Sequence, residues 1–223
     1  MLRLCADEAL AASKDRAGRR PLTPGEIASN WGEDMRESLL ARYAFRTPQE
    51  AVDMYEAARD DWFTAEPDKW LAASSTFYDG AVEAVRTVDA SSDSDSTAVY
   101  VVTSRPRAAT RALLSAAGLP LDDDRVLADV DGDAAKAAAI VELRQRHADA
   151  TIAFVDDRVA PLRTVANNLG LFGIELYHAR WGYSTPQQEA EAAAMPRVRG
   201  LGPESAELAR ALRGDETEAE AEA

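Results

Sequence analysis

Short apolar runs that alternate with amphipathic stretches limit the fold of this chain more than any other feature of its sequence. The clearest run, Ala-Val-Tyr-Val-Val at 98–102, is continuous and β-prone, and further runs follow at 151–155 and 171–177. A run without polar alternation is typical of a strand that is covered on both faces. Strands that alternate with helices indicate a parallel sheet with crossover connections. The sequence therefore predicts an α/β fold built on such a sheet.

The segments around these runs have the pattern of helices. Glycines at 118 and 170 mark helix ends. A weak short strand is expected at 125–128 and a last edge strand at 197–201. The expected helices span 81–88, 106–117, 134–146, 160–169 and an alanine-rich stretch from Thr185 to just before Pro196.

The first third of the chain is predicted to be helical. Thr23-Pro24-Gly25-Glu26 and Thr47-Pro48-Gln49-Glu50 both have the form of a capping box with proline at the first helical position. In such a box the threonine hydroxyl accepts from the amide three residues on, and the glutamate reaches back. No β-branched apolar run interrupts residues 24–71, so we expect two or three packed helices there.

Charge and composition exclude several classes of protein. The chain has 39 acidic and 25 basic residues and a formal net charge of -14, which repels nucleic acid and anionic lipid. The single cysteine, Cys5, excludes an internal disulfide, and no apolar run approaches the ~20 residues that span a bilayer. We therefore expect a soluble protein without nucleic-acid or membrane partners, in the cytoplasm or in an organelle such as the chloroplast. Its last ten residues, 214–223, are predicted to form an acidic disordered tail.

Polar residues at the ends of the predicted strands are the candidates for chemistry, because ligands bind doubly wound sheets at the carboxyl ends of the strands. Thr103 and Ser104 follow one strand, Lys136 lies in the helix after the weak strand, and Asp156 and Asp157 follow another. Hydroxyl and ammonium groups can hold phosphate oxygens, and neighbouring carboxylates can hold Mg²⁺. Together these residues indicate phosphoryl chemistry.

Each candidate also has a structural interpretation. Thr103 and Ser104 can cap the helix that follows them, and Asp156 and Asp157 can cap the helix near residue 160. Lys136 can be an ordinary solvated helix residue. The order and placement of all the candidates favour function over these alternatives.

Three segments resemble motifs of the haloacid-dehalogenase-like (HAD-like) hydrolases. Residues 99–106 resemble the second motif of that family, Asp133-Ala134-Ala135-Lys136 the third, and residues 152–158 the fourth. Residues 76–82 are similar to the segment where such chains re-enter their core from the cap. Leu176 to Thr185, followed by 192–198, looks like a plant and algal subgroup of the family.

The resemblance, which covers about residues 4–205, implies an organisation and an activity. The HAD-like core, a Rossmann-like parallel sheet with helices on both faces, would comprise residues 1–13 and 76–213, and a small helical cap would comprise residues 14–75. The implied activity is Mg²⁺-dependent hydrolysis of a small phosphorylated substrate through an aspartyl-phosphate. Thr103 and Ser104 would bind the phosphoryl group, Lys136 would neutralise it, and Asp156 and Asp157 would hold Mg²⁺.

One departure from the family pattern is large. Family members open with a strand that ends in Asp-x-Asp-Gly and supplies the nucleophile, and no such segment precedes Leu4-Cys5. That strand would lie in the centre of the sheet, between the strands that end at Thr103 and Asp157, so we expect its loss to leave both without a shared partner. The first hypothesis is a truncated phosphohydrolase. The alternative is a catalytically inactive HAD-like domain that acts as a binding or regulatory module.

The aspartates at 129–133 and the two histidines are further polar residues that could take part in chemistry. Asp129-Val130-Asp131-Gly132-Asp133 has the letters of the nucleophile motif, either as a permuted nucleophile or, as we prefer, as a turn with Asp133 as the helix N-cap. His147 and His178 have no second histidine or cysteine at metal-ligand spacing, so we expect surface or hydrogen-bonded structural roles for them.

Overall fold

The computed structural model describes residues 32, 33, 37, 41, 45–75, 77–89, 97–182, 184–202 and 204–213. The chain divides into two compact units, Met1–Ala65 and Glu66–Ala223. Three predictions lie outside the described residues: the capping box at Thr23, the segment around Leu4-Cys5 and the acidic tail.

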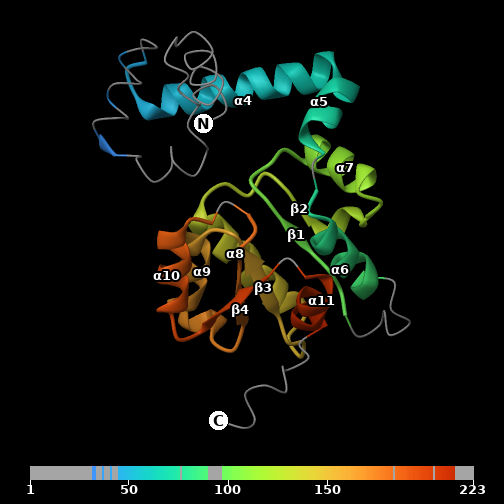
Figure 1. The fold of residues 1–223 in the computed structure, drawn as a ribbon, viewed down its shortest axis with the longest axis vertical. Coiled ribbons are helices and arrows are strands. Elements are labelled where there is room, and N and C mark those ends of the chain that lie inside the picture. Colours follow the sequence, from blue (N-terminus) through green and yellow to red (C-terminus); the bar gives the residue numbers. More distant parts are fainter. Residues whose placement is uncertain are drawn as a thin grey trace, which may run out of the picture. The chain divides into compact units, whose positions relative to one another are not determined.

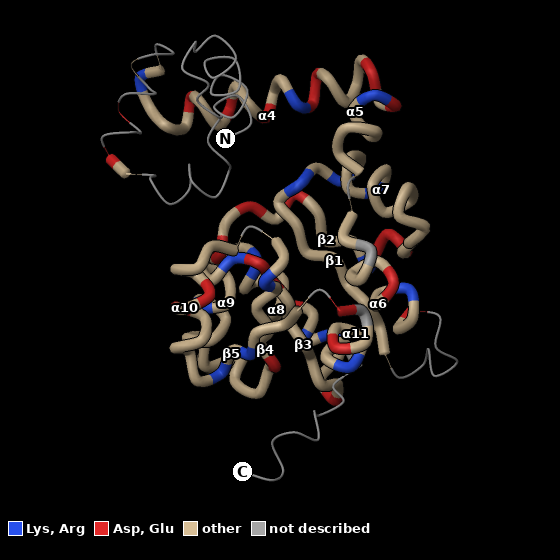
Figure 2. Tube along the Cα trace, viewed as in Figure 1, with Lys and Arg blue, Asp and Glu red and all other residues tan. Residues whose placement is uncertain are grey.

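In the first unit the principal described element is helix α4 (Pro48–Ala65). The threonine half of its predicted capping box is confirmed, because the Glu50 amide donates to Thr47 Oγ1 at 3.2 Å. The Glu50 carboxylate reaches back one residue further than in a capping box and accepts from the Arg46 amide at 2.8 Å. Residues of both charge signs lie along this helix, and none of its residues is buried (Figure 2). The cap therefore forms from local interactions alone.

The second unit contains strands β1–β5 and helices α5–α11 (Figure 1). From β1 to α11, strands and helices alternate along the unit, as the sequence predicted. In chain order the elements are α5 (Pro67–Ser74), α6 (Asp79–Asp89), β1 (Val101–Val102), α7 (Arg107–Ala116), η1 (Asp123–Arg125), β2 (Val126–Leu127), α8 (Asp133–Arg146), β3 (Ala153–Asp156), α9 (Val159–Ala166), η2 (Leu169–Leu171), β4 (Glu175–Ala179), α10 (Pro186–Ala193), β5 (Val198–Leu201) and α11 (Ser205–Arg213).

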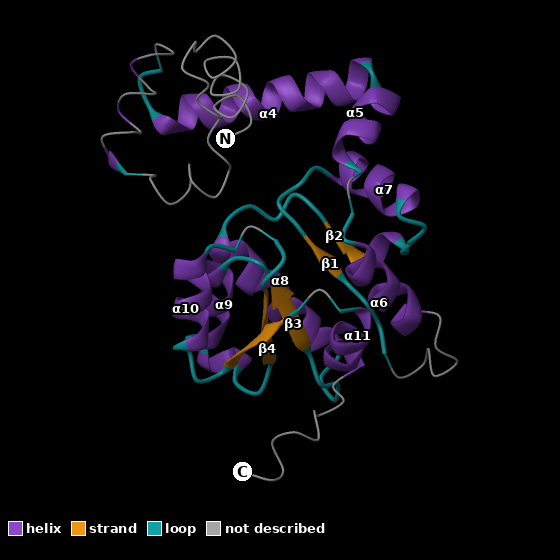
Figure 3. Ribbon diagram, viewed as in Figure 1, coloured by secondary structure: helices purple, strands orange, loops and turns teal. Residues whose placement is uncertain are grey.

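The strands form two small parallel sheets. Strand β1 pairs with β2, and β3, β4 and β5 pair in that order, with Asp156 opposite His178 and Ala179 opposite Leu201. The predicted α/β class with parallel strands is therefore confirmed. Within the described residues, β1 and β3 belong to different sheets, and each has one edge that carries no strand (Figure 3).

Helices cover both faces of the β3-β4-β5 sheet. On one face, Phe154 of β3 and Leu176 of β4 pack with Ile140 of α8 and with Leu162 and Val165 of α9. On the other face, Val155 and Tyr177 pack with side chains of α6 and α11. Successive residues of a strand point to opposite faces of the sheet, and here Phe154 and Leu176 face one group of helices while Val155 and Tyr177 face the other. Burial on both faces explains why β3 and β4 are apolar without polar alternation.

Polar contacts join the segments around the β1-β2 sheet to their neighbours. Arg125 beside β2 pairs with Asp89 at the end of α6 at 2.6 Å, and Asp89 is the largest cause of the raised pKa of that guanidinium. Tyr100 Oη lies 2.7 Å from His147 Nε2 at the C-terminal end of α8. Trp70 of α5 is 1% exposed, with the Arg105 guanidinium 5.9 Å from its ring centre.

Two segments differ from their predicted structure. The run 171–177 is a strand only in its second half: Leu171 ends η2, a turn with Gly173 at a φ of 90° follows, and β4 starts at Glu175. The Arg197 guanidinium donates to the carbonyls of Leu171 (3.2 Å) and Ile174 (3.3 Å) on either side of this turn. The run 98–102 pairs only at Val101 and Val102. Helix α11, which the sequence analysis missed, buries Leu208 and Ala209 against the sheet.

Among the helices that the structure describes, none is both long enough and apolar enough to cross a membrane.

Candidate active site

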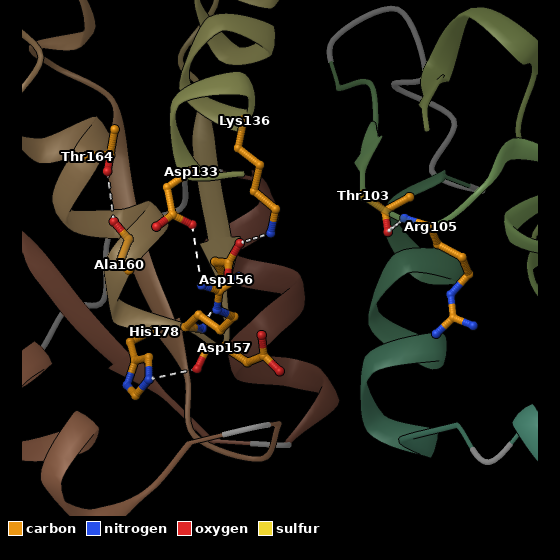
Figure 4. A network of polar contacts seen from close by, with 10 residues as sticks. Thr103, Arg105, Asp133, Lys136, Asp156, Asp157, Ala160, Thr164 and His178 are labelled. Carbon is orange, nitrogen blue, oxygen red and sulfur yellow. Dashed lines mark hydrogen bonds and ion pairs between the residues drawn. The ribbon is translucent and has the colours of Figure 1, made fainter. Parts of the chain in front are cut away.

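The centre of the candidate site is an ion pair between Lys136 and Asp156 (Figure 4). Asp156 is the last residue of β3, and Lys136 lies in the first turn of α8. Lys136 Nζ is 2.6 Å from Asp156 Oδ2, and the two side chains are 16% and 6% exposed. The other carboxylate oxygen, Oδ1, accepts from the Arg158 amide at 2.9 Å. Two residues that were selected separately from the sequence therefore meet at the carboxyl end of β3, and Lys136 is not a solvated helix residue.

A second ion pair strengthens this junction. Arg158, which follows β3, places its guanidinium 3.5 Å from the carboxylate of Asp133, the first residue of α8. Both partners are more exposed than the Lys136 pair, at 52% and 31%. A carboxylate in the first turn of a helix also interacts favourably with the helix dipole. The start of α8 is thus tied to the end of β3 at two points, and Arg158, which lies in the segment that resembles the fourth motif, had no role assigned to it from the sequence.

Asp157 lies in a different local environment from Asp156. It is half-buried, and the turn after β4 passes directly over it. A Cβ atom built on Gly182 would lie within 3.0 Å of Asp157 Cβ, Cγ and Oδ2. His178 of β4, which is 1% exposed, places Nε2 3.3 Å from the Asp157 carbonyl oxygen and 3.4 Å from Ser184 Oγ. The predicted hydrogen-bonded role of His178 is confirmed.

Thr103 and Ser104 lie at the end of β1. The Thr103 amide donates to the Leu127 carbonyl, and the Thr103 carbonyl accepts from the Val130 amide. Its Oγ1 accepts from the Arg105 amide at 3.2 Å. Ser104 is exposed. In Figure 4 Thr103 stands apart from the Lys136 and Asp156 pair, so the structure places these predicted residues on two separate strand ends and does not bring them into contact.

The capping alternatives do not describe these residues. The residue before α7 is Pro106 and the residue before α9 is Arg158, and neither helix has a side-chain cap. Asp156 and Thr103 instead accept from amides within the turns that follow their strands. Both side chains shape the turns at the carboxyl ends of the strands.

The aspartates at 129–133 form a turn. Asp129 has a φ of 60° and Gly132 a φ of 82°, and Asp129 donates its amide to the Arg105 carbonyl. The expectation that Asp133 is the N-cap is wrong: Gly132 occupies that position, and Asp133 is the first helical residue. The left-handed conformation that the chain needs there favours glycine, which explains the shift.

Two neighbouring carboxylates, those of Asp156 and Asp157, are the candidate ligands for Mg²⁺ at the end of β3. Within the described residues no group of three or more histidine, cysteine, aspartate or glutamate side chains is placed to hold a metal. Mg²⁺, however, is commonly held by one or two carboxylates, with waters and substrate phosphates completing the octahedron. Asp157 fits that mode of binding. Asp156 already uses both oxygens, with Lys136 and with the Arg158 amide.

Comparisons with known proteins add no relative to this picture. No family model, no curated protein and no solved structure matches the chain.

Proposed function

We propose that this chain is the core of a HAD-like phosphohydrolase that acts on a small phosphorylated substrate with Mg²⁺. The observation that carries the proposal is the shielded pair of Lys136 and Asp156 at the carboxyl end of β3, beside Asp157. A lysine and a carboxylate that can hold a metal ion, at the edge of a parallel sheet where ligands bind, are groups that can stabilise a phosphoryl group during transfer. They match the third and fourth motifs to which the sequence is similar.

In this proposal each residue has a separate task. An ammonium group has three N–H donors, so Lys136 can hold Asp156 and also donate to a phosphate oxygen. Asp156 directs the Lys136 ammonium group at the strand end. Asp157 is the ligand proposed for Mg²⁺, which when bound would neutralise charge on the phosphoryl oxygens. Thr103 would donate its hydroxyl to the phosphoryl group from the end of β1.

The separation of the two sheets supports the place that the resemblance gives to the nucleophile. The family places its first strand between the strands that here are β1 and β3, and these two strands have no common partner in the described part of the chain. A strand there that ends in Asp-x-Asp-Gly would carry its aspartates to the edge that holds Thr103 and Lys136. In the family, the first aspartate attacks phosphorus, the alcohol leaves with a proton from the second, and water then releases inorganic phosphate.

Binding of inorganic phosphate to the full chain tests the proposal. Isothermal titration calorimetry with phosphate is expected to give one binding site. The affinity for phosphate is expected to be higher with excess Mg²⁺ than with EDTA, because bound Mg²⁺ would favour the phosphate complex. Lys136→Met and Thr103→Val are expected to weaken it by about tenfold or more each, because each removes a donor to a charged oxygen. Lys69→Met, at an exposed ion pair with Glu66, is the matched control and is expected to bind phosphate normally.

A chain that binds neither phosphate nor Mg²⁺ would contradict the proposal. That result would favour the inactive binding or regulatory module. Phosphate binding that Lys136→Met leaves unchanged would also contradict it, because the anion would then lie at another place.

A further inference from the structure

The turn that follows β4 lies over Asp157. The proposed function assigns no role to the residues of this turn. The turn comprises Arg180, Trp181, Gly182 and Ser184, with Tyr183 outside the described residues. We propose that His178 and Gly182 are positioning residues, which together fix the direction of the Asp157 carboxylate for a hydrated Mg²⁺. The proposal rests on the proposed function. It adds that a turn outside the second, third and fourth motifs holds Asp157, the proposed ligand for Mg²⁺, in position.

The first observation is the contact between His178 and the Asp157 backbone. A carbonyl oxygen can only accept a hydrogen bond, so the 3.3 Å contact with the Asp157 carbonyl requires a proton on His178 Nε2. Ser184 Oγ, at 3.4 Å, can share that proton as a second acceptor. At 1% exposure the ring is held by packing in β4, directly opposite Asp156 in the ladder. His178 therefore links the backbone of Asp157 to the far end of the turn.

The second observation is the close approach of Gly182. A Cβ atom at this position would lie within 3.0 Å of three Asp157 atoms, one of which is Asp157 Cβ. Atoms so near the backbone cannot swing away as the tip of a long side chain can. An alanine at 182 must therefore move either the carboxylate or the turn.

The third observation is that both ends of the turn are anchored. The Arg180 amide donates to the Leu201 carbonyl at 3.1 Å, and Trp181 packs on the cluster formed by α6, α11 and the sheet. At the other end, Thr185 caps α10 by accepting from the Gln188 amide at 3.3 Å. Because the described residues on both sides of Gly182 are anchored, a displacement at Gly182 is expected to reach Asp157.

Four variants of the full chain test the proposal. Gly182→Ala introduces the overlap, while Gly200→Ala in β5 is the matched control, because its Cβ would meet only Arg180 side-chain atoms at 3.5 Å. His178→Leu removes the Nε2 donor, and His178→Gln places an amide donor in a similar position. Mg²⁺ alone is titrated into each protein by calorimetry, and thermal unfolding reports the integrity of the fold.

The expected result is a loss of Mg²⁺ affinity of about tenfold or more for Gly182→Ala and His178→Leu, as is typical when the support of a metal ligand is removed. Gly200→Ala should bind as the unmodified chain does, and His178→Gln should recover most of the loss. Normal affinity in both Gly182→Ala and His178→Leu would overturn the inference and leave the proposed function intact.

A readout without metal separates the two proposals. The ¹³C chemical shift of the Asp157 carboxyl carbon is expected to change in Gly182→Ala and in His178→Leu, and to stay the same in Gly200→Ala. An unchanged shift in the first two variants would overturn the positioning role whether or not Mg²⁺ binds. If the shift changes but the unmodified chain binds no Mg²⁺, the turn still positions Asp157 and it is the proposed function that fails.

Discussion

Replacing Lys136 by methionine is expected to destabilise the second unit strongly, because it leaves the Asp156 carboxylate buried without its partner. At 2.6 Å the attraction between the two charges is about 6 kcal/mol for an effective dielectric constant near 20. Desolvation of both charges offsets much of this attraction in the intact pair, but it does not help the variant. Removing one member of a buried pair typically lowers the free energy of unfolding by about 3–5 kcal/mol.

The assay is urea unfolding at pH 7, followed by circular dichroism. With a slope of about 2 kcal/mol per molar urea, a loss of 3–5 kcal/mol lowers the midpoint by about 1.5–2.5 M. Lys69→Met makes the same substitution at an exposed pair, with side chains 74% and 46% exposed, and is expected to lose at most about 1 kcal/mol. The double variant Lys136→Met with Asp156→Leu should recover more than half of the loss, since no buried charge remains.

Equal losses in Lys136→Met and Lys69→Met would refute this reasoning. So would a double variant that is less stable than Lys136→Met alone, because the loss would then come from packing of the lysine stem and not from the stranded carboxylate.

Three further predictions follow from individual contacts. Arg197→Met is expected to lower the free energy of unfolding by at least about 2 kcal/mol, because the guanidinium donates to the carbonyls of Ala166, Leu171 and Ile174. In the same urea assay, Arg197→Lys should recover less than half of the stability that Arg197→Met loses. Burial, and then the bond to Glu175, raise the pKa of Tyr177 to about 12, so the unfolded phenol ionises first and stability should fall between pH 10 and 12. Tyr177→Phe should flatten that fall in urea midpoints measured across this range, and an equal slope in both proteins would contradict the assignment. Thr185→Ala should lose about 0.5–2 kcal/mol through its missing cap, and Thr185→Asp should retain most of the stability; equal losses in both would show that the cap is not the cause.

The sequence predicted those elements whose signals are local. The helices after Thr47 and Thr185 begin where threonine and proline form a cap, and α8 and β3 lie within two residues of their expected bounds. Their boundaries depend on caps and on burial of both faces, which leave a pattern in the chain itself.

Other features depend on contacts between distant segments. The run at 171–174 is apolar but forms a turn, for which Gly173, with a φ of 90°, is a local signal. The hydrogen bonds from Arg197 to the carbonyls of Leu171 and Ile174 come from a distant segment and leave no pattern in the run itself. Helix α11 does have a local signal in the spacing of Leu208 and Leu212, which was overlooked beside the acidic tail.

The candidate site was also predicted in part. Their places near predicted strand ends and the resemblance to family motifs selected Lys136, Asp156 and Asp157. Neither indicated that the lysine would use one oxygen of Asp156 and the Arg158 amide the other. The need for glycine at 182 arises from its approach to Asp157, twenty-five positions earlier, so only the folded chain reveals it.

The most direct test of the central claim is the hydrolysis of p-nitrophenyl phosphate with Mg²⁺, measured for the chain alone and for the chain extended at Met1 by an apolar strand that ends in Asp-x-Asp-Gly. The account predicts no turnover by the chain alone, turnover by the extended protein, and loss of that turnover on Lys136→Met. Turnover by the chain alone that depends on Asp129 or Asp131, or an extended and folded protein with no turnover, would contradict it.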